Sequence, residues 1–344
     1  MKPKQFVVLA AIAAATSLLA ILTWSANNEW SEVTLGGSKL LPVVSGDPDK
    51  TARIEIRNHD SVIELERAGK EWKVKNRDGY PAKAEDAIRL VRRLAAAERV
   101  EPKTRKADRY HLIGTQDVEA EGSAAKRIRL FDAAGKQIAD VLVGRTRIDA
   151  FGAGKAGTYA RIPGEDQAWL VSGELDPAMR VKDWVEDEVF ELVATKMKRL
   201  ELQVAGGEPV VVERSKRDDG SYGDAKFVGL PEGTKPKAGD GAADLMRAAG
   251  SIDLEDVRKL AATPVGEGIS TITFAGVDGL NVTMRVRKDG EDHWLSLEAS
   301  GEGEAAKSAQ ELTARTAGWE YKLNPSKPAK LVPDRAALFE TTSG

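Results

Sequence analysis

The segment Gly152–Thr158 (GAGKAGT) is the part of the chain that comes nearest to a phosphate-binding loop. In such a loop the spacing G-x-x-x-x-G-K-[ST] leads from a strand into a helix, and backbone amides hold the phosphate oxygens. Here Lys155 precedes the second glycine of the pair, and the flanking residues predict β-hairpins. We therefore interpret the segment as a flexible connection between strands.

Metal ligation and acid–base catalysis need convergent side chains, and the spacing of such residues here does not favour either. His59, His111 and His293 have no second His or carboxylate three or four residues later on a predicted helix. The acid pairs Asp187-Glu188 and Asp218-Asp219 suit solvated turns and helix faces. No G-x-S-x-G elbow occurs, and no S-x-x-K motif in a fitting context. We expect no catalytic, cofactor-binding or metal site, and no enzyme.

Composition excludes further classes. The 344 residues contain no Cys, so disulfides, thiol nucleophiles and thiolate metal sites are excluded. With 51 Lys and Arg against 54 Asp and Glu, the net charge is -3, and no global basic field attracts nucleic acid. A hydrophobic content of 42% is enough for two or three domains with real cores.

Basic side chains are concentrated on and after one predicted helix. In the run AEDAIRLVRRLAAAERV, Ala84, Ile88, Val91 and Leu94 or Ala95 recur at helical spacing and predict the buried face. The opposite face is either simply solvated or contacts anionic lipid or an acidic partner. The candidate contact residues are Arg89, Arg92, Arg93, Arg99 and Lys103.

The region before that helix predicts strands, and the same order returns later in the chain. Ala52–Val74 predicts a three-strand meander with one buried face. A similar segment starts at Met197, where Leu200 and Leu202 match Ile54 and Ile56.

The offset between matched positions is nearly constant. Arg53 and Arg199 differ by 146 positions, and Ile128 and Ile272 by 144. This period predicts a tandem duplication of one α+β module of about 145 residues. The alternative is that β-hairpins simply resemble one another.

The tryptophans of the predicted modules are spread one to each structural unit. Large aromatic side chains in such positions favour core packing, and a sugar-stacking surface is the functional alternative. These residues are Trp72, Trp169, Trp184, Trp294 and Trp319.

The N-terminal segment predicts a membrane anchor. Phe6 to Trp24 is an uncharged run of 19 residues, which at about 1.5 Å per residue nearly spans a bilayer core. Lys2 and Lys4 precede it, so the positive-inside rule places the N-terminus in the cytoplasm and the bulk of the chain in the periplasm. Trp24 and Trp30 are candidates for the outer membrane interface. A cleaved signal peptide is the alternative.

The predicted fold class is α+β, with a single N-terminal transmembrane helix followed by two similar modules of antiparallel meanders and hairpins, each with a packed helix. The second module is expected to close with a helix at Ala305–Thr316, a strand at Trp319–Leu323 and a last turn at Arg335–Phe339. The predicted divisions are an anchor at 1–28, a linker at 29–50, a first module at 51–190 and a second at 191–344.

Several segments of the chain resemble the DUF4340 family of bacterial membrane-anchored proteins. They are GTYARIPGEDQAWLVSGELD, DWVEDEVFELVATKMKRLEL and GWEYKLNPSKPAKL, together with DRYHLIG, which is similar to a Tyr-x-x-Leu-Gly-Leu element. The resemblance covers roughly Lys39 to Phe339. It implies an inner-membrane protein with a repeated exported region and an association with ABC-type export systems of the gliding-motility kind. It brings no catalytic residues.

Three hypotheses follow from the sequence. The first is a non-enzymatic periplasmic accessory subunit beside an ABC permease. The second is a ligand-binding or sensory ectodomain for a polysaccharide, lipid or peptide, which requires an apolar cleft with convergent polar groups. The third is an envelope hydrolase, which requires acid or Ser-base pairs assembled from distant positions.

Overall fold

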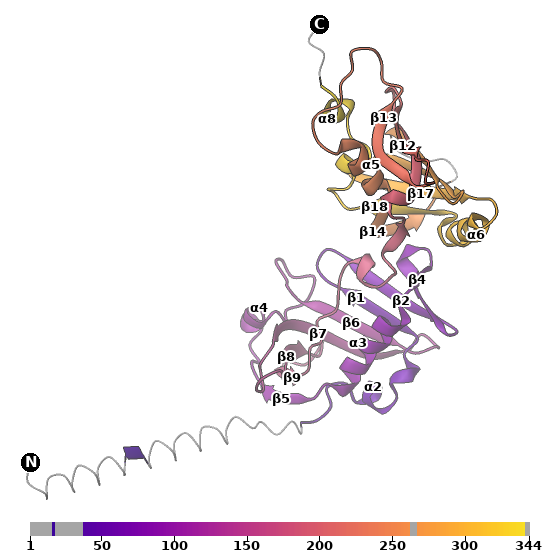
Figure 1. Ribbon diagram of the computed structural model, residues 1–344. Coiled ribbons are helices and arrows are strands. Elements are labelled where there is room, and N and C mark those ends of the chain that lie inside the picture. Colours follow the sequence, from indigo (N-terminus) through magenta and orange to yellow (C-terminus); the bar gives the residue numbers. More distant parts are fainter. Residues whose placement is uncertain (1–15, 18–36, 262–266, 341–344) are drawn as a thin grey trace, which may run out of the picture. The chain divides into compact units, whose positions relative to one another are not determined.

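The computed structural model describes residues 16–17, 37–261 and 267–340, and it shows an α+β protein with two antiparallel sheets (Figure 1). The chain divides into two compact units. The described residues within Met1–Arg67 and Ala84–Met179 form the first, and those within Ala68–Lys83 and Arg180–Gly344 form the second. The predicted boundary at 190/191 therefore differs from the observed one, and the prediction did not assign residues 68–83 to the second unit.

No helix among the described residues is both long and apolar enough to span a bilayer. Apart from Thr16 and Ser17, the predicted span Phe6–Trp24 lies outside the described residues, as do Trp24 and Trp30.

The first sheet has the order β4-β3-β2-β1-β6-β7-β8-β9-β5, in which β3-β2-β1 is the predicted meander and the strands β3 (Glu71–Val74) and β4 (Tyr80–Ala82) belong to the second compact unit. Its other strands are β1 (Arg53–Arg57), β2 (Val62–Ala68), β5 (Arg99–Pro102), β6 (Lys126–Phe131), β7 (Gln137–Arg147), β8 (Gly157–Arg161) and β9 (Ala168–Ser172). The helices are α2 (Pro42–Gly46), α3 (Ala84–Ala96) and α4 (Tyr110–Ile113), with short 3-10 turns at Pro48–Lys50 and Ala107–Arg109.

The second sheet has the order β10-β14-β18-β17-β16-β15-β11-β12-β13. Its strands are β10 (Glu188–Glu191), β11 (Met197–Gln203), β12 (Val210–Lys216), β13 (Tyr222–Val228), β14 (Ser251–Lys259), β15 (Glu267–Gly276), β16 (Asn281–Asp289), β17 (Asp292–Ser300) and β18 (Trp319–Leu323). The second unit also contains β3 (Glu71–Val74), β4 (Tyr80–Ala82), α5 (Gly241–Ala249), α6 (Ala305–Thr316), α7 (Pro328–Leu331) and α8 (Arg335–Leu338), with 3-10 turns at Lys75–Arg77, Val181–Asp183 and Ala194–Lys196. The predicted closing helix, strand and turn are confirmed as α6, β18 and α8.

The two sheets share one pairing scheme. When the second order is taken in reverse, β12-β11-β15-β16-β17-β18-β14 corresponds strand for strand to β2-β1-β6-β7-β8-β9-β5. Ile56 pairs with Ile128 across β1 and β6, and Leu202 pairs with Ile272 across β11 and β15. All four side chains are fully buried. The positions related by the sequence period thus hold equivalent places in the registers.

Alternation explains why these strands form. In β1 the buried Ile54 and Ile56 point to one face, as period-two packing requires, and Leu200 and Leu202 do the same in β11. Helix α2 contacts α3 and β7, while α6 packs on β17. These contacts cover the apolar faces of the sheets and give each unit its own core.

Residues 68–83 belong to the second compact unit, although their strands β3 and β4 are the end strands of the first sheet. Here β3 and β4 form a hairpin in which Val74 lies opposite Tyr80. Arg77 binds Asp256 of β14 with two hydrogen bonds, of 2.6 and 2.8 Å. The ring of Tyr80 meets the ring of Trp319 edge to face, with centroids 4.9 Å apart. Charge pairing and aromatic packing thus hold the hairpin in the second unit.

The predicted linker 29–50 is folded from Gly37 onward. Leu40 and Val44 are fully buried, and Lys39 forms a bridge with Glu98. A Cβ atom on Gly37 would lie 1.8 Å from the carbonyl oxygen of Arg99, so only glycine fits this close approach. The buried apolar residues of this short segment make it part of the first core.

Candidate functional site

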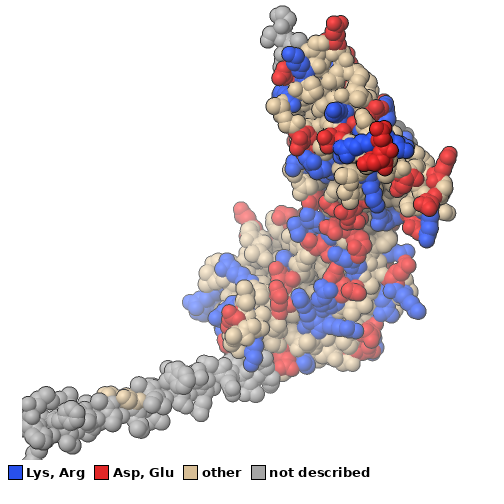
Figure 2. Space-filling model, viewed as in Figure 1, with Lys and Arg blue, Asp and Glu red and all other residues tan. Residues whose placement is uncertain are grey.

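Helix α3 presents the basic surface that the sequence predicted. Its buried face consists of Ala87, Leu90, Val91, Leu94 and Ala95. Its outer residues border a shallow groove of about 570 Å³, and we call them the α3 face. Figure 2 shows Lys and Arg side chains gathered where Figure 1 draws α3. The α3 face consists of Glu85, Ile88, Arg89, Arg92, Arg93 and Ala96.

The prediction that Ile88 is buried was wrong, because its side chain is 37% exposed. Ala87 and Val91 occupy the centre of the buried stripe, and Ile88 lies about 100° away from Ala87 around the helix. An aliphatic side chain thus lies among arginines on the outer surface.

The arginines of the α3 face differ in their partners. Arg89 forms an ion pair with Asp86 at 2.7 Å. Arg92 and Arg93 are exposed, and within the described part of the chain neither has an ion pair. Two adjacent positive charges without a partner favour binding of an acidic surface.

The remaining two basic residues of the predicted set lie elsewhere. Arg99 is on the edge strand β5, and Lys103 directly follows that strand. Arg99 pairs with Glu165 at 3.3 Å and lies over the ring of Trp169, and Lys103 pairs with Glu101. Their charges are already satisfied within the unit, so the structure does not join them to the α3 face.

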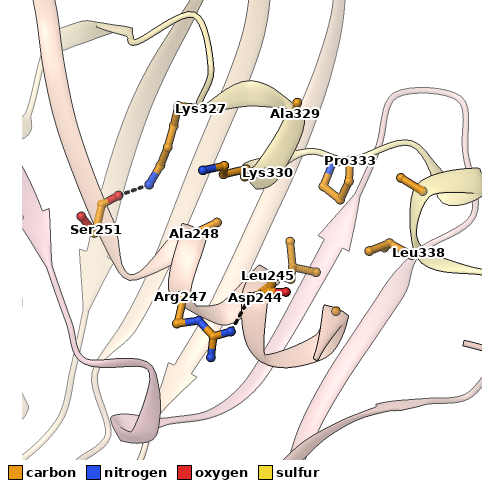
Figure 3. A pocket seen from close by; sticks show the side chains of 12 residues that line it. Asp244, Leu245, Arg247, Ala248, Ser251, Lys327, Ala329, Lys330, Pro333 and Leu338 are labelled. Carbon is orange, nitrogen blue, oxygen red and sulfur yellow. Dashed lines mark hydrogen bonds and ion pairs between the residues drawn. The ribbon is translucent and has the colours of Figure 1, made fainter. Parts of the chain in front are cut away.

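A second candidate site is a cavity of about 630 Å³ between α5 and the C-terminal helices α7 and α8 (Figure 3). Leu245 and Ala248 of α5 face Pro333 and Leu338 across it. Its volume lies within the roughly 300–1,000 Å³ that is usual for small-molecule sites. Apolar walls on both sides make this a place where a small apolar group can be buried.

Charged side chains lie on one side of the cavity. Lys327 donates a hydrogen bond to the carbonyl oxygen of Ser251, just after α5 ends, and Lys330 lies beside it (Figure 3). Burial lowers the pKa of Lys327; the Asp253 carboxylate opposes this change, and the neighbouring Lys330 adds to it. Two ammonium groups therefore repel each other at the edge of an apolar cavity.

Sequence reasoning missed this lysine pair, which lies in the NPSKPAKL segment. The signal was the spacing, since Lys327 and Lys330 are three residues apart and Pro328 starts a helical turn between them. Residues at i and i+3 share one side of such a turn. Nothing local, however, indicates α5 as the opposite wall, because it lies about 80 residues earlier in the chain.

The other sequence candidates have structural roles. Gly152–Thr158 covers the connection of β7 to β8 and the start of β8, and the Asp149 carboxylate accepts the amide of Gly154 at 2.8 Å. The Asp219 carboxylate accepts two hydrogen bonds from Ser221 in a solvated turn, which lowers its pKa. His59 lies 3.2 Å from the carbonyl oxygen of Val118. Across residues 16–17, 37–261 and 267–340, no three His, Asp or Glu side chains gather as a metal-binding group.

Tryptophans pack into or against the cores. Trp72, Trp184 and Trp294 are buried, and Trp169 and Trp319 are half-buried. A cationic side chain lies over each half-buried ring. Lys259 Nζ lies 3.5 Å from the centre of the Trp319 ring, and the Arg99 guanidinium lies over the Trp169 ring. The prediction of core packing is confirmed for the three buried rings.

The DRYHLIG segment contains α4, which packs on the first sheet. Tyr110 starts α4 and donates to the carbonyl oxygen of Asp166 at 2.6 Å, while Arg161 lies over its ring. Gly114 ends the helix with φ of +70°, a left-handed cap that suits glycine. A Cβ atom on Gly144 of β7 would meet the Ile113 carbonyl oxygen at 2.2 Å. This close backbone contact seats α4 on β7.

We expect Gly144→Ala to destabilise the first unit by about 1–3 kcal/mol, because backbone atoms cannot move aside as a side-chain end can. Urea unfolding of the full-length chain measures the change. Gly46→Ala is the control, since a Cβ atom there has nothing within 4 Å. Equal midpoints for the two variants would show that α4 is not held at Gly144.

Comparison with known proteins gives one match. The family model described as "Domain of unknown function (DUF4340)" matches residues 72–249, just over half of the chain. No curated protein and no solved structure matches the sequence or the fold. The matched range runs from β3 to the end of α5.

Proposed function

The chain belongs to the DUF4340 family, and on that premise we propose that it is a non-enzymatic accessory subunit of a membrane complex, namely an ABC-type export system. The uncharged run Phe6–Trp24 anchors it, and the folded units lie on the periplasmic side of the inner membrane. The partner is a membrane protein of the permease type, in keeping with the association that the family resemblance implies.

The observation that carries this proposal is the α3 face. Arg92 and Arg93 lie exposed beside Ile88, and no described residue pairs with either arginine. A partner that supplies carboxylates to both arginines and an apolar contact to Ile88 would satisfy the surface. Arginine is enriched at protein interfaces, since its planar guanidinium forms two parallel hydrogen bonds with a carboxylate.

We further propose that the two units arose by tandem duplication of one module. The matching strand order and the matching registers of Ile56–Ile128 and Leu202–Ile272 support this origin. A duplicated module gives the subunit two related folded bodies, and the unpaired arginines of the α3 face lie on only one of them.

Copurification tests the proposal. Full-length protein tagged at its C-terminus is extracted from its native membrane in mild detergent, and mass spectrometry identifies associated proteins and the intact mass. We expect an uncleaved chain with a stoichiometric permease and ATPase. Arg92→Glu with Arg93→Glu should reduce the recovered permease at least about tenfold, because like charges then face each other.

A matched pair of exposed arginines provides the control. Arg145 and Arg147 on β7 are exposed and have no ion pair within the described residues, so reversing both charges changes the net charge equally. This variant should retain the partner. A solitary or cleaved protein, or equal loss in both variants, would contradict the proposed subunit role.

A further inference from the structure

The cavity between α5 and α7–α8 combines features that the accessory role does not use. Leu245, Ala248 and Pro333 are buried and form apolar walls, and Leu338 is half-buried. Lys327 and Lys330 extend along one side (Figure 3). One region of the cavity is thus apolar and another is positively charged.

The lining charges do not cancel. Of the four charged residues around the cavity, Asp244 is the only acid, and its carboxylate accepts a hydrogen bond from Arg247 of the same helix. Lys330 is exposed and has no ion pair within the described residues. Lys327 donates a hydrogen bond to a neutral carbonyl oxygen, and the Asp253 carboxylate, which does not line the cavity, offsets only part of the effect of burial on its pKa. A negative group placed between the two ammonium groups would relieve their mutual repulsion.

We propose that this cavity binds a small anionic amphiphile, with its carboxylate or phosphate head held by Lys327 and Lys330 and its short apolar chain packed between Leu245, Ala248, Pro333 and Leu338. The head is a charged acceptor, which suits two lysine donors. The chain is aliphatic, because the side chains that face each other across the cavity, Leu245 and Ala248 against Pro333 and Leu338, are aliphatic. A fatty acid and a phosphate-bearing lipid fragment share this chemistry.

Binding is tested on the full-length chain held in zwitterionic phosphatidylcholine nanodiscs, by calorimetric titration with octanoate, octyl phosphate, octanol and inorganic phosphate. Titration of empty nanodiscs is subtracted. We expect saturable binding of both anionic amphiphiles and none of octanol. The tighter of octanoate and octyl phosphate identifies a carboxylate or a phosphate as the natural head group.

Charge and shape are then tested separately. Lys327→Gln with Lys330→Gln should weaken octanoate at least about tenfold, because two charged donors are lost. Lys216→Gln with Lys288→Gln, at exposed positions away from the cavity, makes the same charge change and should leave affinity unaltered. Ala337→Phe places a ring at an exposed lining position and should weaken the amphiphiles without disturbing the core.

The fold is checked by circular dichroism for each variant. If the double variant unfolds, Lys330→Gln alone replaces it, since that lysine has no ion pair within the described residues.

A bound head group should also return the pKa of Lys327 toward its ordinary value, which NMR of methylated lysines follows. The proposal is overturned by absence of saturable binding, by unchanged affinity in the lysine variants, or by inorganic phosphate binding as tightly as octyl phosphate. These results are independent of copurification with a permease.

Discussion

Replacing Glu320 with glutamine is expected to lower the free energy of unfolding of the second unit by about 3–5 kcal/mol. Glu320 of β18 is 2% exposed and accepts hydrogen bonds from two arginines. Arg287 Nε lies 2.7 Å from one carboxylate oxygen, and Arg258 Nε lies 3.0 Å from the other. Without the carboxylate, the buried charge of Arg287 has no counterion.

No neighbouring group in the described structure can replace the Glu320 carboxylate as the counterion of Arg287. Arg287 is 5% exposed, and its Nη1 atom already lacks a partner in the described structure. Arg258 retains Asp289 at 2.8 Å and the ring of Trp294, so it stays neutralised. The cost therefore falls on Arg287, which neither water nor another carboxylate reaches readily.

Urea unfolding followed by tryptophan fluorescence measures this effect. Glu298→Gln is the matched control, because Glu298 pairs with Arg285 at 2.9 Å on an exposed surface and should cost no more than about 1 kcal/mol. A second variant, Glu320→Leu with Arg287→Met, should recover most of the lost stability, since apolar residues replace both charges. If Glu320→Gln costs no more than the control, the buried network contributes no more to stability than an exposed ion pair.

The second large effect is expected from Tyr80→Ala, at about 3–5 kcal/mol. Tyr80 is 8% exposed, and its ring packs edge to face on Trp319 at 4.9 Å and on Tyr321 at 6.4 Å. Although its residue number places it in the first predicted module, these contacts belong to the second unit. We therefore expect the loss of stability to appear in β14 and β18.

Hydrogen exchange with mass spectrometry locates that loss by peptide. Tyr80→Ala should speed exchange in β14 and β18 before β1 and β6 respond. The control Tyr159→Ala removes a half-buried ring from β8, and its effect should appear in β7 and β9. Faster exchange confined to the first unit in the Tyr80 variant would show that residues 68–83 are not anchored where the structure places them.

The sequence by itself determined local elements and the faces that they bury. Alternation at Ile54 and Ile56, repeated at Leu200 and Leu202, indicated buried strand faces, and both occur. The closing helix Ala305–Thr316 was predicted with the observed bounds. These features follow from periodicity within short segments, which depends only on neighbouring residues.

Tertiary structure alone decided which surfaces remain free. The periodicity of α3 was compatible with burying Ile88, but Ala87, Leu90 and Val91 fill the buried face and leave Ile88 outside. The basic residues were likewise one run in sequence, yet Arg99 is neutralised by Glu165, which lies 66 residues later. A pairing over that distance has no local signal.

The place of residues 68–83 in the second compact unit and the position of the cavity at Lys327 have the same explanation. Arg77 finds Asp256 at a separation of 179 residues, and Lys327 meets the carbonyl oxygen of Ser251 at 76. Sequence patterns report the face that a segment buries, because burial follows from its own side chains. They do not report the partner against which that face packs, since many apolar surfaces are chemically equivalent and only shape and charge complementarity in three dimensions select one.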